Sequence, residues 1–201
     1  MLPPDTLAAL VSFAFVASIT PGPNNIMLTA SGVNFGFVRT IPHMLGIGVG
    51  FMALLGAVGM GIATVFRIAP QLETVLKVVG TLYMLWLAWK VATATKIAET
   101  GGQVGRPMTF WQAVAFQWVN PKGWVMAVSA MALYVRPSNL VADVAAVTLI
   151  FGVVNLPSVA TWAAFGHALR NVLRDPSRIR IFNIAMGLLL AASVLPIVFS
   201  R

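Results

Sequence analysis

Long apolar stretches separated by short polar ones run along the whole chain. Five windows contain no charged residue: 6–38, 40–66, 107–121, 144–169 and 181–200. A helix needs about 20 mainly apolar residues to cross a bilayer. The pattern therefore predicts an all-α polytopic membrane protein. Its six transmembrane helices are expected at about 7–31, 41–66, 74–95, 109–134, 140–166 and 180–199.

The first of these segments carries its own interruption. In its middle the chain reads Pro21-Gly22-Pro23-Asn24-Asn25. Each proline removes a backbone donor, and the glycine loosens the backbone further. Unwound backbone at membrane depth is tolerated only where it is buried in protein or lines a cavity. The sequence therefore predicts a broken first helix beside a polar cavity.

A second interruption follows one hundred residues later, where Asn120, Pro121 and Lys122 fall inside the fourth segment. Helices broken at corresponding places in two halves indicate a transporter with its site at the midplane. With three helices each, the halves 1–95 and 109–201 would be inverted repeats, joined by a cytoplasmic linker, 96–108. Together they form a single membrane transport domain. One shared break is also compatible with chance.

Lys122 is the one charge placed well within a predicted span, about 20 Å from its start at 1.5 Å per residue. An intramembrane ionisable group is a functional-site hypothesis by default. Lys122 either binds a substrate carboxylate or bonds backbone carbonyls in a structural role. Asn24 and Asn25 either cap the second half-helix and satisfy the freed carbonyls, or also bind a zwitterion.

Two further polar residues are weaker candidates for coupling or for lining the cavity. His43, near the inner end of the second helix, is either an interfacial residue or a proton-coupling group. Asn155 precedes Pro157 in the fifth helix, where a kink is expected.

Composition narrows the function classes. Hydrophobic residues make up 59% of the 201 positions and charged ones 9%, so a soluble domain is excluded. The net charge of +8 does not indicate nucleic-acid binding, because the basic residues flank the predicted spans, as topology signals do. Their distribution predicts both termini in the periplasm, because the cytoplasmic side then holds eight of them: Arg39, Lys90, Lys96, Arg106, Arg170, Arg174, Arg178 and Arg180. The periplasmic side holds four: Arg67, Lys77, Arg136 and Arg201.

Several chemistries are missing. The chain has no cysteine, no metalloprotease or hydrolase motif, and no carboxylate deep in a predicted span. We therefore expect no enzyme activity, no metal and no cofactor. The lack of a deep carboxylate also argues against a cationic substrate.

Three motifs resemble one family of membrane proteins. Residues 20–25, Thr-Pro-Gly-Pro-Asn-Asn, resemble the signature of the lysine exporter/homoserine–threonine resistance family of amino-acid exporters. Asn120-Pro121-Lys122 and the third-helix pattern 80–90 are similar to its other motifs. The Pro-Gly-Pro-Asn-Asn form, with 87–90 and 110–111, most resembles the branch that exports cysteine, O-acetylserine and related small neutral amino acids.

The resemblance implies gradient-driven secondary efflux of a small amino acid across the bacterial inner membrane. The site would comprise 21–25 and 120–122. The proton is the expected coupling ion, lipid surrounds the protein, and a homodimer stays open as its assembly. Family members have been drawn with fewer spans, so five spans remain an alternative to six. A channel or ion/lipid carrier of similar architecture and a non-transport membrane assembly subunit are the functional alternatives.

Overall fold

The computed structural model describes residues 3–62, 68, 70–94, 106–173 and 175–195, and within them every regular element is helical. The helices are α1 (Pro4–Ile19), α2 (Pro23–Phe35), α3 (Phe37–Gly59), α5 (Pro70–Ala92), α6 (Phe110–Phe116), α7 (Pro121–Tyr134), α8 (Leu140–Arg170) and α9 (Pro176–Ala192), with the short 3-10 turns η1 (Gln117–Val119) and η2 (Pro137–Asn139).

Each predicted span corresponds to helix in the structure. The first is divided into α1 and α2, with a bend of 54° between them, and the fourth is divided into α6, η1 and α7. By length and composition, three described helices could cross a membrane, or four when the bent pair counts as one. The six-span count and the repeat therefore stay predictions. The span ends 63–66 and 196–199, the linker residues 96–105, and Arg67, Lys96, Arg174 and Arg201 lie outside the described residues.

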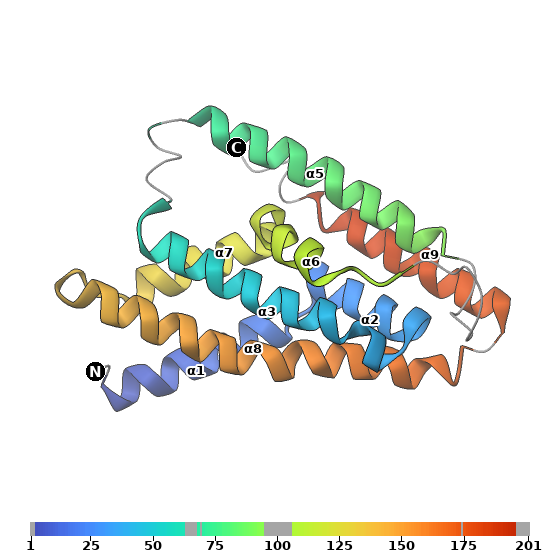
Figure 1. Cartoon of the computed structure of the whole chain (residues 1–201), viewed down its shortest axis with the longest axis horizontal. Helices are drawn as coiled ribbons and strands as arrows, with labels where there is room; N and C mark the ends of the chain where they lie inside the picture. The colour runs from blue at the N-terminus through green and yellow to red at the C-terminus, as the bar shows by residue number, and fades with distance from the viewer. Residues whose placement is uncertain (1–2, 63–67, 69, 95–105, 174, 196–201) are drawn as a thin grey trace.

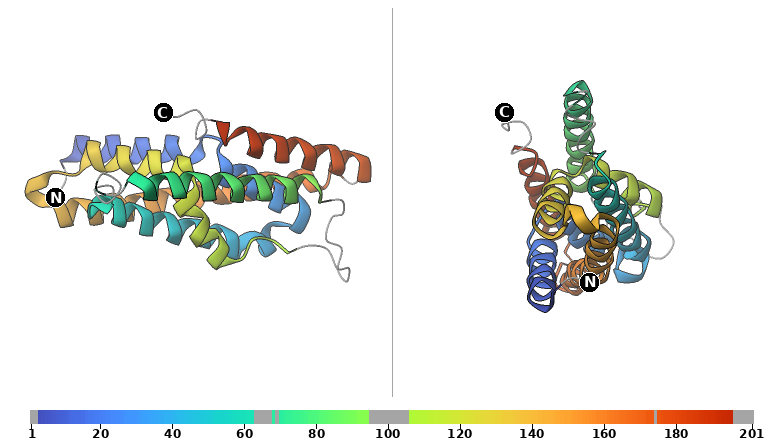
Figure 2. Two further views of the ribbon diagram at one scale, coloured as in Figure 1. Left: turned by 90° about the horizontal axis from the view of Figure 1, so that it is seen from above. Right: turned by 90° about the vertical axis from the view of Figure 1, so that its left-hand side faces the viewer.

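The helices run roughly along one long axis, with α3 and α8 packed together near the centre (Figures 1 and 2). α1 and α2 pack on α8, whereas α6 and α7 pack on α3. α5 lies on the outside of the bundle beside α9. Rings from three of these helices interlock in the core, since Phe151 meets Phe13 and Phe51 edge to face at 6.0 and 5.6 Å.

Glycines set two of these helix crossings. A Cβ on Gly50 would lie 2.7 Å from the Val114 Cα, and one on Gly32 would lie 2.8 Å from the His167 backbone nitrogen. Small residues let helix backbones approach closely in membrane proteins. The same mode of contact therefore joins α3 to α6 and α2 to α8.

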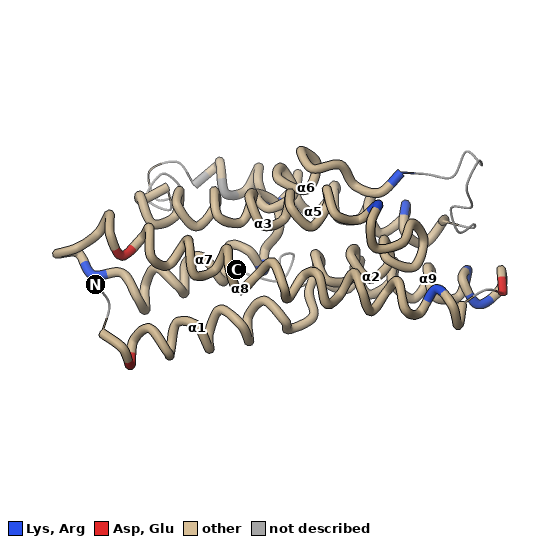
Figure 3. The backbone as a smooth tube through the Cα atoms, turned by 60° about the horizontal axis from the view of Figure 1, so that its bottom comes forward, with Lys and Arg blue, Asp and Glu red and all other residues tan. Residues whose placement is uncertain are grey.

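Charged residues are concentrated at the two ends of the bundle (Figure 3). The end where α9 begins and α2, α5 and α8 finish carries most of the described basic residues: Arg39, Lys90, Arg106, Arg170, Arg178 and Arg180. At the opposite end Arg136 forms a 2.7 Å ion pair with Asp143, and this hydrogen bond raises the pKa of Arg136. Between the ends the outer face is apolar, with Val16, Val153 and Leu188 each at least 60% exposed. Such a surface suits lipid rather than water.

Candidate functional site

At the first break, side chains bind three carbonyls, those of Ser18 and Ile19 at the end of α1 and that of Thr20 just after it. Asn25 Nδ2 donates to the carbonyls of Ser18 and Thr20, at 3.0 and 2.9 Å. Trp162 Nε1, from α8, donates to the Ile19 carbonyl at 3.1 Å. Asn25 therefore satisfies carbonyls at the break, which is the structural role considered for it above. All three carbonyls therefore have protein donors in this conformation.

The second break is built in a similar way. α6 passes through η1 to Asn120, whose backbone is extended, and α7 begins at Pro121. The Trp124 indole donates to the Trp118 carbonyl across this break, at 2.8 Å. Lys122 therefore lies in the first turn of a half-helix that starts within the bundle.

Lys122 joins the two breaks. Its ammonium Nζ donates to the Thr20 carbonyl, 102 residues earlier in the chain. Its side chain lies directly against Gly22, where a Cβ would come within 2.5 Å of the Lys122 Cδ. Gly22 is extended, with φ −168°, so a Cβ here would displace the Lys122 side chain without straining the backbone. The structural role considered for Lys122, bonding a backbone carbonyl, is thus what this conformation shows.

Two amide side chains form a second link between the breaks. Asn24 Nδ2 donates to Gln117 Oε1 at 2.8 Å, and Gln117 Nε2 donates back to Asn24 Oδ1 at 3.1 Å. Gln117 is fully buried and also bonds the Ala113 carbonyl. The pair fastens the first turn of α2 to η1.

A small cavity of about 20 Å³ lies where the breaks meet. Such a volume suits about one water molecule. Its lining includes six residues expected or newly found at the site: Gly22, Asn24, Asn25, Gln117, Asn120 and Lys122. Asn155 reaches it from α8 and donates to the Ser18 hydroxyl at 3.2 Å. The site is therefore assembled but closed around its own hydrogen bonds.

Unused hydrogen-bonding groups remain around this cavity. The side-chain oxygens of Asn120 and Asn155 are buried and have no partner among the described residues. Neither Gly22 nor Asn120, the residues that precede α2 and α7, gives its helix a side-chain cap. Buried acceptors and uncapped helix N-termini are groups that a ligand can satisfy. The described lining carries one cation, Lys122, and no carboxylate.

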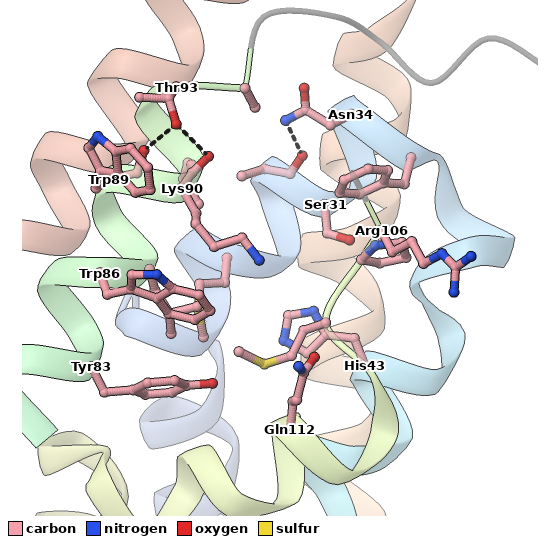
Figure 4. Close-up of a pocket in the computed structure, with 18 residues that line it drawn as sticks. Ser31, Asn34, His43, Tyr83, Trp86, Trp89, Lys90, Thr93, Arg106 and Gln112 are labelled. Atoms are coloured by element: carbon pink, nitrogen blue, oxygen red, sulfur yellow. Dashed lines mark hydrogen bonds between the residues drawn. The ribbon is translucent and has the colours of Figure 1, made fainter. Parts of the chain in front are cut away.

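Most of the predicted site residues are brought together, but not all. Pro21, Pro23 and Pro121 shape the bends without lining the cavity. His43 lies elsewhere, in a larger cavity of about 480 Å³ between α2, α3, α5 and α6 (Figure 4). Its ring is 2% exposed, and neither ring nitrogen has a partner among the described residues.

Sequence reasoning missed Gln117 and Trp162. Gln117 carried a signal, because an amide three residues before Asn120 is unusual in an apolar span. Trp162 carried none, since tryptophan is common in membrane helices and only the fold brings it to the Ile19 carbonyl.

Comparison with known proteins places this arrangement in a family. The family model described as LysE type translocator matches residues 15–195, which include both breaks. The chain belongs to the LysE type translocator family. This confirms the resemblance carried by the three motifs, and it makes the protein a translocator rather than an enzyme.

Relatives of known name match this chain over most of their own length. The chain is 30% identical over 191 residues to the cysteine/O-acetylserine efflux protein of Escherichia coli (strain K12), covering 93% of this chain and 94% of the relative. The proteins of the same name from Shigella sonnei (strain Ss046) and Shigella flexneri serotype 5b (strain 8401) match to the same extent. No solved structure matches.

Proposed function

We propose that the protein is a secondary transporter that exports small neutral amino acids or their derivatives from the cytoplasm across the bacterial inner membrane. Family membership and relatives named for cysteine/O-acetylserine efflux support export of this class. The observation that carries the proposal is the meeting of two helix breaks at Lys122, in an apolar bundle.

The chemistry of the small cavity favours a zwitterion. Lys122 and the uncapped N-termini of α2 and α7 offer positive potential to a carboxylate. The free oxygens of Asn120 and Asn155 offer acceptors to an ammonium group. A second substrate cation would find no carboxylate there, and an unpaired buried charge is costly. Once the site opens, its charge pattern therefore matches small neutral amino acids and not lysine or arginine.

Transport requires that the closed site open. In our proposal the substrate carboxylate replaces the Thr20 carbonyl as the partner of Lys122, which releases one of the links between the breaks. The packing also supports an inverted repeat. In such a repeat, α1, α3 and α5 of the first half correspond to α6, α8 and α9 of the second. The α1–α8 contact then has the α6–α3 contact as its counterpart, and the α3–α8 and α5–α9 contacts each join two corresponding helices. Alternating access would then rock one half against the other.

We also infer the orientation in the membrane, from the charge distribution, and the coupling ion, from a buried histidine. The basic end of the bundle faces the cytoplasm under the positive-inside rule, which places the start of α1 in the periplasm. The proton is the coupling ion we propose, because His43 is a buried titratable group on a cavity at the basic end.

Counterflow in proteoliposomes tests the function. Vesicles loaded with unlabelled O-acetyl-L-serine should accumulate the labelled compound transiently, with a rate that saturates. Cysteine should compete, whereas lysine and arginine should compete poorly. A rate that rises linearly with concentration would instead indicate a channel. No flux of any amino acid, with Lys122→Gln as folded as the parent, would favour an assembly subunit.

A further inference from the structure

The large cavity is a built space with its own set of polar groups. Facing stripes of α2 and α5 form two of its walls. Tyr83, Trp86 and Lys90 follow one another at helical spacing on α5. At about 480 Å³ it falls within the range of roughly 300–1,000 Å³ typical of small-molecule pockets. It lies at the basic end of the bundle, separate from the small cavity at the breaks.

Most polar side chains on its wall are already engaged by protein. Ser31 shares a 2.8 Å hydrogen bond with Thr40, and Gln112 bonds the Thr109 backbone nitrogen. Asn34 is bound to Asn183, from α9, in both directions. These groups hold helices together and have little capacity left for a ligand.

The wall also carries two cations, Lys90 and Arg106, and a buried imidazole. Figure 4 shows the Arg106 guanidinium extending away from the space that Lys90 enters, so Lys90 is the cation that faces the cavity. Lys90 Nζ lies 4.6 Å from the ring centre of Trp86, and no carboxylate faces it among the described lining residues. His43 presents two buried nitrogens without partners, although buried polar atoms are normally satisfied. Figure 4 shows the Lys90 ammonium and the His43 ring extending from different helices into the same space.

From this arrangement we propose that the large cavity is a second binding site for a zwitterionic amino acid, which Lys90 holds by its carboxylate and His43 by its ammonium. A neutral imidazole has one nitrogen that accepts a hydrogen bond, which an ammonium can donate. Tyr83 and Trp86 stack at 5.5 Å and form the apolar wall for the side chain. The inference rests on the proposed export function, since it assigns the site where substrate waits on the cytoplasmic side before the breaks open.

Thiol protection can report on this cavity alone. The chain has no cysteine, so Thr93→Cys places a single thiol on the cavity wall. O-acetyl-L-serine should slow its modification by a small maleimide in purified protein. Propionate and ethylamine, which carry only one of the two charges, should protect at clearly higher concentrations.

Variants of the two proposed ligands make the test specific. Lys90→Gln and His43→Leu should each raise the half-protecting concentration about tenfold or more, because each loses a hydrogen bond to a charged group. Lys90→Arg should retain most of the protection. Arg178→Gln, an exposed basic residue at the same end that does not line the cavity, is the matched control and should change nothing.

The failures of the two proposals are distinguishable. Protection that is absent, or unchanged in both Lys90→Gln and His43→Leu, overturns the second site even if counterflow is saturable. Protection that persists in Lys122→Gln while counterflow falls supports a site separate from the breaks. Protection without counterflow of any amino acid supports the site and refutes export.

Discussion

Gly22→Ala should displace the Lys122 side chain although Lys122 itself is not substituted. The new Cβ would lie within 2.5 Å of the Lys122 Cδ and 3.3 Å of Nζ. Because the lysine side chain is flexible and the helices are packed, Lys122 should move away and lose its place at the breaks. A hydrogen bond to a charged group contributes about 1.5–3 kcal/mol. Displacement should therefore weaken substrate binding by roughly ten- to a hundredfold, measured as the counterflow KM.

The design has an internal control and a clear refutation. Gly48→Ala, also in a predicted span, adds a Cβ with nothing within 4 Å, so its KM should match that of the parent. If Gly22 acts through Lys122, the double variant Gly22→Ala/Lys122→Gln should be little worse than Lys122→Gln alone, because contacting residues are not additive. Normal binding by Gly22→Ala, or fully additive losses, would refute the proposed role of this contact.

Three further predictions follow from the breaks and the charge pattern. Asn24→Ala and Gln117→Ala should show a coupling free energy of about 1 kcal/mol in a double-mutant cycle of unfolding, from two membrane hydrogen bonds of about 0.6 kcal/mol each; additive effects would contradict the pair. The double variant Pro21→Ala/Pro23→Ala should keep membrane expression but lose most efflux, since a continuous helix would reclaim the Thr20 carbonyl that Lys122 binds and remove the free N-terminus of α2; normal efflux would show that transport does not need the first break. A single cysteine at position 178 should be labelled only from the cytoplasm, and labelling from the periplasm would reverse the proposed orientation.

The helical fold and both breaks could be predicted from the sequence because they depend on local chemistry. Apolar length sets the spans, and Pro21, Pro23 and Pro121 remove donors wherever the helices lie. Lys122 was likewise visible, because a charge inside an apolar run is conspicuous in any fold. The motifs of the chain indicated the class of protein, and the match to the family model confirmed it.

The partners of these residues could not be predicted, because they come from distant segments. Thr20 and Lys122 are 102 residues apart, and Asn24 and Gln117 are 93 apart. The sequence also could not show which donors satisfy the carbonyls freed at the first break. In the fold, α8 supplies Trp162 to one of them, so the free acceptors are amide oxygens instead. The separation of His43 from the breaks likewise follows from packing.

The central claim is that Lys122 binds the substrate carboxylate where the two breaks meet. The most direct measurement compares counterflow of O-acetyl-L-serine with that of its carboxamide, in the parent and in Lys122→Gln. The parent should prefer the carboxylate by at least about tenfold, the effect of one charge-assisted contact, and Lys122→Gln should lose most of that preference. An undiminished preference in a well-folded Lys122→Gln protein would contradict the account.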